Sequence, residues 1–258
     1  MDLTRQTLLS VNLNKVALVR NSRAGNRPSV VEAARIAMAA GCQGLTLHPR
    51  EDERHATLRD VADLGALPEV RDGRIELNIE GDFRQPVAEA AKAAGAKQFT
   101  IVPVAPGEIT TERGWKTRDG MDELRKAVDF FAPYARVSVF VDAEEEGIRM
   151  AAEAGAGAIE FHTKHYAETF GTPEGDAVLD QICRMGDLAR SLGLRVNAGH
   201  DLDTVNLPLL VRRLAPDEVS IGHALISDAI FAGLGTVTRS FLAALASTGA
   251  ASANGPGL

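Results

Sequence analysis

A dense run of ionisable residues follows a short apolar segment near the start of the chain. The apolar or β-branched residues 45–47 lead directly into His48, Pro49 and Arg50, and another arginine, three carboxylates and His55 follow within five residues. Pro49 stops a helix from continuing and removes a backbone donor, so the chain must turn there. Two imidazoles beside an arginine could transfer protons and bind an anion, whereas the plainer interpretation is a solvated turn.

The same arrangement, a polar side chain at the end of an apolar segment, recurs along the chain. The residues in these positions are Asn12, Asn14, Lys15, Asn78, Glu80, Asp142, Glu160, His162, Asn197, His200 and His223. All six histidines (48, 55, 162, 165, 200 and 223) stand at or just beyond such an end, and we expect none of them in a helix. A single histidine of this kind is usually structural, but six along one rim indicate an active site.

Two carboxylates of this set have apolar neighbours. Glu80 and Glu160 each follow an isoleucine near the end of an apolar segment. Burial raises the pKa of a carboxyl group, so each could act as a general base or acid near neutral pH. A metal site is less favoured, because the chain has neither a His-x-His pair after the first segment nor a His-Glu-x-x-His motif. His162 and His165 could still form part of one.

Eight apolar segments alternate with helical patterns, and these elements must position the polar side chains. We expect strands at 8–13, 44–48, 74–79, 98–102, 136–141, 158–162, 194–198 and 218–221. We expect helices at 28–40, 58–64, 86–94, 120–132, 144–154, 176–192, 207–214 and 224–246, the last broken at Gly233 and Gly235. Glycines 41, 95, 155 and 193 each follow a helix, as left-handed helix-ending residues do.

This alternation predicts an α/β protein with a closed (β/α)8 barrel. Repeated strand–helix units favour a parallel sheet with right-handed crossovers. No G-x-G-x-x-G motif follows the first strand, which argues against a dinucleotide-binding fold. We expect one barrel domain over residues 1–246. In such a barrel the carboxyl ends of the strands, where the polar side chains stand, carry the active site.

Two glycine-containing turns suggest where an anion would bind. Residues 197–200 (Asn-Ala-Gly-His) end the seventh strand, and residues 221–224 (Ile-Gly-His-Ala) join the eighth strand to a helix. Loops after these two strands, together with a helix N-terminus, commonly hold phosphate in this fold. The alternative is that both are ordinary strand–helix turns. Arg20, Arg23 and Arg50 suggest a second anionic group, although Arg20 or Arg23 could be a surface charge.

Composition narrows the class of protein. The 258 residues match the roughly 250 residues of a (β/α)8 barrel. A net charge of −7 without a basic stripe argues against nucleic acid as a partner. Cys42 and Cys183 are expected as buried thiols in a reducing compartment. With neither a signal sequence nor an apolar run of membrane-spanning length, we expect a cytosolic protein with no membrane partner.

One long loop and one terminal segment are additions to the eight strand–helix units of the barrel. Residues 103–118, after the fourth strand, are polar and contain Thr110 and Trp115, the only tryptophan. Loops longer than roughly 12–15 residues are usually functional lids or disordered segments. We expect a mobile lid that orders over bound substrate. Residues 247–258 are small and rich in Gly, Ala and Ser, and we expect a disordered tail there.

Five segments together resemble a known family. They cover residues 11–17 (Val-Asn-Leu-Asn-Lys-Val-Ala), 46–55 (Thr-Leu-His-Pro-Arg-Glu-Asp-Glu-Arg-His), 77–80 (Leu-Asn-Ile-Glu), 196–200 (Val-Asn-Ala-Gly-His) and 221–224 (Ile-Gly-His-Ala). In this order they are similar to the pyridoxine 5′-phosphate synthases, from about residue 9 to residue 245. The resemblance implies a (β/α)8 barrel with additional helices, assembled as a homo-octamer. It also implies a cofactor-independent transferase of vitamin B6 biosynthesis, which condenses 1-deoxy-D-xylulose 5-phosphate with 3-amino-2-oxopropyl phosphate and releases phosphate and water.

The resemblance also implies roles for individual residues. His48 and Glu80 match proton acceptors, His200 matches a proton donor, and Glu160 matches a residue that stabilises the transition state. Matches to contacts with the aminoketone phosphate are Asn12, Arg23, Gly222 and His223, and matches to contacts with the deoxyxylulose phosphate are Arg50, His55 and Thr110. Many members have Asp, His and Gly where this chain has Asn14, Lys15 and Asp201. We interpret these three differences as variations in substrate binding.

Two other functions stay open at this stage. A class I aldolase or related lyase on the same barrel would use Lys15 or Lys164 to form a Schiff base. A non-catalytic phosphate-binding relative would keep the glycine turns without needing His48, Glu80 and His200 together. In the ring-closing reaction the amine of the substrate itself forms the imine, so the protein must supply acid/base groups and two anion sites.

Overall fold

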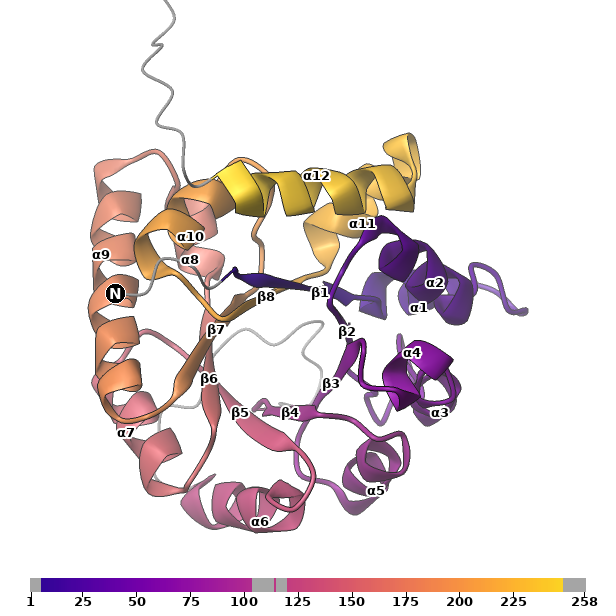
Figure 1. Ribbon diagram of the computed structural model, residues 1–258, viewed down its shortest axis with the longest axis horizontal. Helices are drawn as coiled ribbons and strands as arrows, with labels where there is room; N and C mark the ends of the chain where they lie inside the picture. Colours follow the sequence, from indigo (N-terminus) through magenta and orange to yellow (C-terminus); the bar gives the residue numbers. More distant parts are fainter. Residues whose placement is uncertain (1–5, 104–113, 115–119, 248–258) are drawn as a thin grey trace, which may run out of the picture.

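Eight parallel strands form a closed barrel that a ring of helices surrounds (Figure 1). The computed structural model describes residues 6–103, 114 and 120–247. The strands are β1 (Leu8–Asn12), β2 (Gly44–Leu47), β3 (Glu76–Gly81), β4 (Gln98–Ile101), β5 (Arg136–Val141), β6 (Ala158–His162), β7 (Arg195–Gly199) and β8 (Glu218–Ile221). The helices found in these residues are α1 (Asn14–Asn21), α2 (Val30–Ala40), α3 (Leu58–Gly65), α4 (Pro68–Arg71), α5 (Gln85–Ala93), α6 (Met121–Phe131), α7 (Glu145–Glu153), α8 (Lys164–Thr169), α9 (Pro173–Ser191), α10 (Leu207–Leu214), α11 (His223–Ala232) and α12 (Leu234–Ala246).

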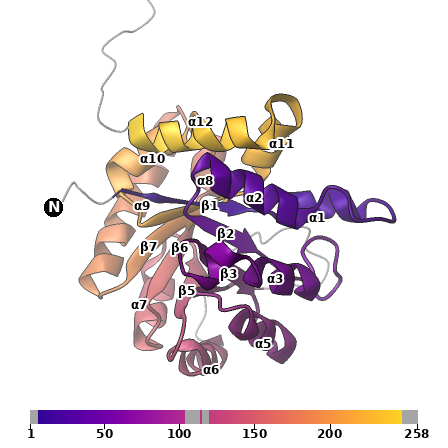
Figure 2. The same ribbon diagram turned by 45° about the vertical axis from the view of Figure 1, so that its right-hand side comes forward.

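The strand order follows the sequence, and β8 pairs with β1 to close the sheet. The (β/α)8 barrel expected from the sequence is therefore confirmed. Strands β5, β6 and β8 have the expected bounds, and the other five differ by at most two residues at either end. Figure 2 shows how the helices lie around the outside of the strands. The carboxyl ends of all eight strands therefore meet at one face of the barrel, as expected from the sequence.

The inside of the barrel is polar, whereas branched apolar side chains usually fill the centre of this fold. Gln98 of β4 donates to Oε1 of Glu218 on β8 at 3.2 Å and accepts from Nδ2 of Asn197 on β7 at 3.1 Å. Neither strand is a neighbour of β4, so these side chains meet across the barrel. Burial there raises the pKa of Glu218 to about 8. Other buried polar side chains of the strands are Ser10, Thr46, Asn78, Thr100, Ser138, Glu160 and Ser220.

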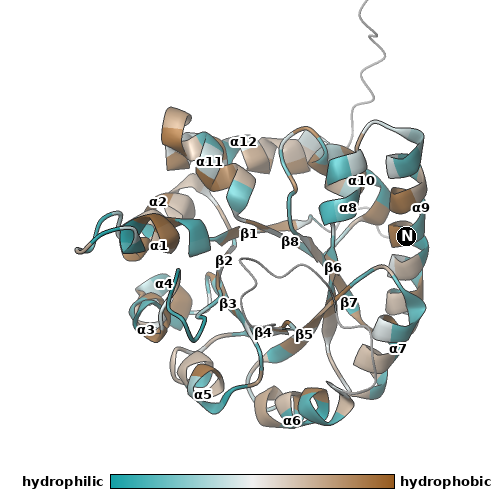
Figure 3. Cartoon of the chain, turned by 180° about the vertical axis from the view of Figure 1, so that it is seen from behind, coloured by the Kyte–Doolittle hydropathy of each residue, from teal (hydrophilic) through white to brown (hydrophobic). Residues whose placement is uncertain are grey.

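The outward face of the strands is apolar and forms the core with the helices. Side chains alternate along a strand, so the residues between the polar ones point towards the ring of helices. They include Leu9, Val11, Leu45, Leu47, Leu77, Ile79, Phe99, Ile101, Val137, Val139, Ile159, Phe161, Val196, Ala198, Val219 and Ile221, all buried. Figure 3 shows hydrophilic and hydrophobic residues mixed along the surrounding helices. Removing this apolar surface from water contributes roughly 25 cal/mol for each Å² buried and supplies the main stabilisation of the barrel.

Capping residues set where two helices near the active face begin and end. The side chain of Ser29 accepts from the backbone N–H of Glu32 and caps α2, and Gly41 ends this helix at φ 108°. Thr57 and Asp60 form a reciprocal capping box at the start of α3. Such boxes satisfy backbone donors that have no partner within the helix. Glycines 95, 155 and 193 also have positive φ angles, which confirms their expected helix-ending conformation.

The structure differs from the sequence-based expectation in three places. It contains α1, α4 and α8, which the sequence pattern did not locate individually. The expected last helix is divided only at Gly233, which separates α11 from α12, whereas Gly235 lies within α12. His165 lies in α8 and His223 is the first residue of α11, so the expectation that no histidine is helical is wrong. A short helix directly after a strand contains too few turns to show the hydrophobic period by which helices are recognised in a sequence.

Several expectations fall on residues that the structure does not describe. Most of the expected lid, including Thr110 and Trp115, and residues 248–258 of the expected tail lie outside the described residues.

Cys42 is buried and Cys183 partly buried, and both are free thiols. Within residues 6–103, 114 and 120–247, no helix combines the length and the apolarity that crossing a bilayer requires.

Candidate active site

A pocket of about 310 Å³ opens at the carboxyl ends of the strands. Its lining residues are Asn12, Asn14, Lys15, His48, Arg50, His55, Glu80, Val102, Phe140, Glu160, Lys164, His200, Asp201, Ser220, Gly222 and His223. The residues to which the family resemblance assigns a role are all among them except Arg23 and Thr110, and so are Asn14, Lys15 and Asp201. Arg23 is exposed and does not line this pocket, and Thr110 lies outside the described part of the chain. The barrel therefore brings together side chains from both ends of the sequence.

His48 stands at the end of β2 in a neutral state. Its backbone N–H donates to Oδ1 of Asn14 at 2.8 Å, which ties the end of β2 to the start of α1. Burial, followed by the interactions with His55 and Arg50, lowers the pKa of His48 to about 3. At neutral pH this imidazole therefore carries no charge. Its buried Nε2 has no hydrogen-bond partner among the described residues.

Arg50 and His55 form one wall on the same side of the pocket, and Arg50 supplies its positive charge. Each is 7% exposed, and the His48 and His55 ring centroids lie 5.8 Å apart. Burial, followed by the Arg50 charge, lowers the pKa of His55 to about 4. Neither Nε of Arg50 nor Nδ1 of His55 has a hydrogen-bond partner in the part of the chain that the structure describes. A buried donor such as Nε of Arg50 is costly unless it is satisfied, so an anionic ligand fits here.

Glu80 lies at the carboxyl end of β3, beside His48. One of its carboxylate oxygens, Oε2, is 4.0 Å from Nδ1 of His48, and Asn12 Nδ2 approaches the two oxygens at 3.4 and 3.5 Å. Burial raises the pKa of Glu80 to about 7, against the opposing effects of His200, Asn12 and Asn14. A carboxyl group with this pKa exchanges protons readily at neutral pH, as a general base must.

Glu160, on β6, faces Gly199 on β7. A Cβ atom at Gly199 would lie 2.3 Å from Oε1 of Glu160, so only glycine leaves room for this carboxyl group. Burial raises the pKa of Glu160 well above its usual range, and the carboxylates of Glu80 and Glu218 add to this rise. This shift favours the protonated form of Glu160, which can donate a hydrogen bond. Its Oε2 atom is buried without a partner among residues 6–103, 114 and 120–247.

His200 and Asp201 form a hydrogen-bonded pair after β7. Oδ2 of Asp201 accepts from Nδ1 of His200 at 2.8 Å, and this hydrogen bond is the main cause of the lowered pKa of Asp201. Both residues have positive φ angles, 86° and 58°, which side-chain-bearing residues rarely adopt outside functional sites. The buried Thr163 hydroxyl lies 2.7 Å from the Gly199 carbonyl oxygen and 2.6 Å from that of His200. Asp201, expected to bind substrate, therefore also orients the imidazole of His200.

The turn after β8 delivers a helix N-terminus to the pocket. Gly222 precedes α11, whose first residue is His223, and both line the pocket. A Cβ atom at Gly222 would lie 3.2 Å from Cβ of Asn12, so a larger residue would crowd β1. The unpaired N–H groups and partial positive charge of a helix N-terminus favour an anion. This geometry is the one that the glycine turn predicted from the sequence.

Some lining residues were not expected, and some expected ones lie elsewhere. Val102, Phe140 and Ser220 line the pocket because side chains alternate along their strands, a signal that the polar residues of the sequence could not give. Lys164, considered as a Schiff-base residue, also lines the pocket and lies 3.9 Å from Glu168. His165 is largely exposed and pairs with Glu174 at 3.3 Å.

His162 lies behind His200 instead of lining the same pocket. Its Nδ1 is 3.2 Å from Oδ1 of Asp142, and its ring meets that of His200 edge-on at 4.8 Å. Both His162 and Asp142 line a second cavity of about 360 Å³ beside α8 and α9. The six histidines therefore fall into three groups. Four of them line the pocket (48, 55, 200 and 223), His162 packs against His200, and His165 lies on the surface. In the described segments, no three His, Cys, Asp or Glu side chains converge in a way that could hold a metal ion.

Comparisons with known proteins agree with this geometry. The family model described as "Pyridoxal phosphate biosynthesis protein PdxJ" matches residues 9–247. The chain is 42% identical over 230 residues to the pyridoxine 5′-phosphate synthase of Bacteroides thetaiotaomicron, covering 88% of this chain and 94% of that protein. It is 41% identical over 243 residues to the enzyme of the same name from Xanthomonas oryzae pv. oryzae, covering 91% and 94%. The structure described as KGPDC from Streptococcus mutans is similar in fold only, with a TM-score of 0.61, 15% identity and coverage of 93% and 98%.

Proposed function

The chain belongs to the PdxJ family of pyridoxal phosphate biosynthesis proteins, and from this premise we propose that its pocket carries out the ring closure that makes pyridoxine 5′-phosphate. The enzyme thus acts in vitamin B6 biosynthesis on small phosphorylated substrates. The two substrates in this proposal are 1-deoxy-D-xylulose 5-phosphate and 3-amino-2-oxopropyl phosphate, and the other products are phosphate and water. The observation that carries the proposal is one pocket with opposed proton acceptors and donors, flanked by two anion sites.

The two phosphates have separate positions in this proposal. The N-terminus of α11 at Gly222 and His223, with Asn12, holds the phosphate of the aminoketone. Arg50, whose buried Nε lacks a hydrogen-bond partner among the described residues, holds the phosphate of the pentulose together with His55. Thr110 and Arg23 belong to these two sites by resemblance alone. Substrates fixed at both ends would present the amine of one to the ketone of the other, which replaces a bimolecular encounter by positioning.

Acid/base groups around the pocket would carry the proton transfers. The amine of the aminoketone attacks the ketone of the pentulose, and loss of water leaves an imine formed between the substrates themselves. Glu80, with a pKa of about 7, accepts protons, and the family resemblance assigns the same role to His48. His200, held by Asp201, is the proton donor to the leaving oxygen by the same resemblance. Burial favours the protonated form of Glu160, which donates a hydrogen bond to oxygen that gains negative charge in the transition state.

Location and assembly belong to the same proposal. We place the enzyme in the cytoplasm as a homo-octamer, in keeping with the family. Ile230 and Phe231 at the end of α11 are 71% and 92% exposed, which supports a contact between subunits there. Large apolar side chains grouped on a surface usually mark an interface. Light scattering on the purified protein would measure the assembly, and a monomer would contradict this part of the proposal.

A direct assay tests the activity. Purified protein mixed with both phosphorylated substrates should develop the ultraviolet absorption of a pyridinol and release inorganic phosphate in equal amount. Borohydride added with either substrate alone should leave the chain unmodified, because no protein lysine forms the imine. A borohydride adduct on Lys15 or Lys164, without pyridinol formation, would contradict the proposal and favour the aldolase.

A further inference from the structure

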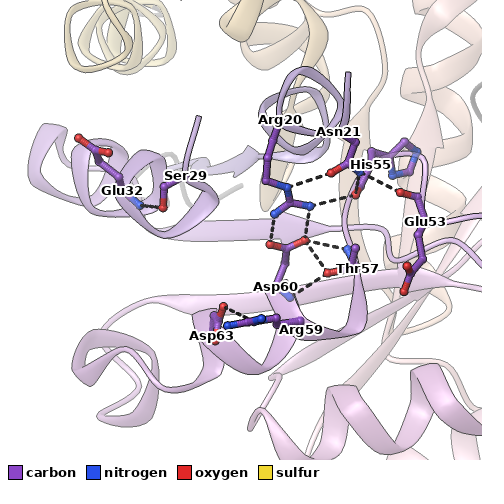
Figure 4. Close-up of polar contacts among 10 residues, drawn as sticks. All are labelled: Arg20, Asn21, Ser29, Glu32, Glu53, His55, Thr57, Arg59, Asp60 and Asp63. Atoms are coloured by element: carbon purple, nitrogen blue, oxygen red, sulfur yellow. Dashed lines mark hydrogen bonds and ion pairs between the residues drawn. The ribbon is translucent and has the colours of Figure 1, made fainter. Parts of the chain in front are cut away.

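A buried ion pair lies beneath the loop that follows β2 (Figure 4). Arg20, near the end of α1, and Asp60, in the first turn of α3, are only 8% and 5% exposed. The guanidinium group donates through both arms, Nη1 to Oδ1 and Nη2 to Oδ2 of the carboxylate, the latter at 2.9 Å. The sequence pattern allows Arg20 to be an anion ligand. In the structure its side chain does not line the pocket, and its charge is already paired with that of Asp60.

Both members of the ion pair also hold the backbone of the loop. Nη2 of Arg20 approaches the carbonyl oxygen of His55 at 3.4 Å, and its Nε donates to Oδ1 of Asn21 at 2.9 Å. Oδ2 of Asp60 accepts from the backbone N–H of Thr57 at 2.8 Å and from its hydroxyl at 2.9 Å. One side of the ion pair thus reaches residue 55 of the loop, and the other reaches residue 57.

Asn21 extends this contact along the loop. Its Nδ2 donates to the carbonyl oxygens of Glu53 and His55, each at 2.8 Å, while its Oδ1 accepts from Arg20. Glu53 has φ 49°, a left-handed conformation that costs free energy in a non-glycine residue. Such a conformation persists where surrounding contacts impose it. Arg20, Asn21 and Asp60 together form a clamp, and they supply contacts of this kind.

The clamped loop carries the wall of the pocket that Arg50 and His55 form. Arg50 and His55 both point into the pocket from this loop, and the loop begins at His48. A shift of the backbone at residue 55 would move the imidazole of His55 by a similar distance. Displacements of about 1 Å can cost roughly 10²-fold in rate when they misplace groups that orient a substrate.

We propose that Arg20, Asn21 and Asp60 are positioning residues, which fix the backbone of residues 53–57 so that Arg50 and His55 hold one substrate phosphate. The assignment of that phosphate to the pentulose rests on the proposed function. The alternative is that the clamp only stabilises the fold. Buried ion pairs are weak evidence for stability, since apolar side chains of similar volume often replace them without loss. The direct bonds to loop carbonyl groups favour a positioning role.

Two variants test the clamp without leaving an uncompensated buried charge. Asn21→Ala removes the bonds to Glu53 and His55 and leaves the ion pair intact. Arg20→Lys keeps the charge and removes the planar fork that reaches several acceptors at once. Each should raise KM for 1-deoxy-D-xylulose 5-phosphate by about tenfold, while KM for 3-amino-2-oxopropyl phosphate stays within about twofold and kcat within about threefold.

Arg59 and Asp63 of the same helix supply the matched control. They form an exposed i,i+4 ion pair with a 3.8 Å separation, and their side chains are 88% and 50% exposed (Figure 4). Arg59→Ala and Asp63→Ala should leave both KM values unchanged. A clamp variant that raises both KM values together, or lowers only the active fraction, would show a purely structural role. If Arg20→Lys does not fold, Asn21→Ala decides the question alone.

A binding measurement separates this inference from the proposed function. Inorganic phosphate can be titrated into the histidine-labelled protein while the imidazole signals of His55 and His223 are followed by NMR. Asn21→Ala should raise the Kd seen at His55 by about tenfold and leave the Kd seen at His223 unchanged. This result would support the clamp even in a protein that makes no pyridinol. Equal Kd values at His55 in the variant and the parent would overturn it.

Discussion

The two sides of the pocket hold their histidines in different ways. On the β2–β3 side, His48 and His55 are buried beside Arg50, and their pKa values fall to about 3 and about 4, so both imidazoles are neutral at pH 7. On the β6–β7 side, Nδ1 of His200 donates to the carboxylate of Asp201, which orients the imidazole. The first side therefore combines a proton acceptor, Glu80 with a pKa of about 7, with the fixed positive charge of Arg50, whereas the second side orients one imidazole through a carboxylate.

The two sides also differ in how the backbone is held. The loop after β2 depends on side chains from α1 and α3, which bond to its backbone from outside the barrel. The turn after β7 is held close to the strands, through the Thr163 hydroxyl, and adopts two successive positive φ angles. Substrate binding can thus be weakened from a distance on the first side, whereas the second side is sensitive to residues in direct contact with it.

The largest effect that this comparison predicts is on the acceptor side. Glu80→Gln should lower kcat by roughly 10²-fold or more with little change in KM, because the variant keeps the shape of the carboxyl group but cannot accept a proton. The parent enzyme should lose activity as pH falls below about 7, the pKa of Glu80, and the variant should lack this limb. Steady-state kinetics against pH would measure both. Glu76→Gln, on the same strand but at the opposite end of the barrel, is the control.

A smaller effect is expected for the cation on the same side. Lys15 lines the pocket from the first turn of α1, where its ammonium group can hold substrate oxygens. Lys15→Met should raise KM for the pentulose phosphate by about tenfold and change kcat by less than about threefold. The exposed Lys126, replaced in the same way, should change neither constant. Loss of all turnover at saturating substrate, with a borohydride adduct at Lys15 in the parent, would contradict the cationic role.

The smallest effect, and the sharpest test of the β6–β7 side, concerns Asp201. Asp201→Asn keeps the shape of the side chain but replaces the carboxylate that orients the imidazole of His200 with a neutral amide. Steady-state kinetics should show kcat reduced by only about threefold. Glu174→Gln, which alters the exposed pair with His165, should leave kcat unchanged. An unchanged kcat in Asp201→Asn would remove the distinction between the two sides.

The sequence by itself determined the barrel and most of the pocket residues. The alternation of strands and helices and the helix-ending glycines are local patterns, because they depend on backbone geometry over a few residues. Polar residues at strand ends must converge once a parallel barrel closes, so the order of strands and polar residues along the chain is enough to assign His48, Glu80, Glu160, His200 and His223 to one pocket. The short helix α8 escaped this reasoning, since it follows β6 directly and is too short for a period.

Only the tertiary structure decided how these residues are charged and held. Arg20 pairs with Asp60 and supports the loop, whereas the sequence allowed it to be an anion ligand or a surface charge. Asp201 reaches His200, and His165 faces solvent, although their positions relative to the strands looked alike. The pKa values of Glu80, Glu160 and Glu218 depend on burial inside a polar barrel built from distant strands. Desolvation and charge interactions act through space, between residues that no local pattern connects.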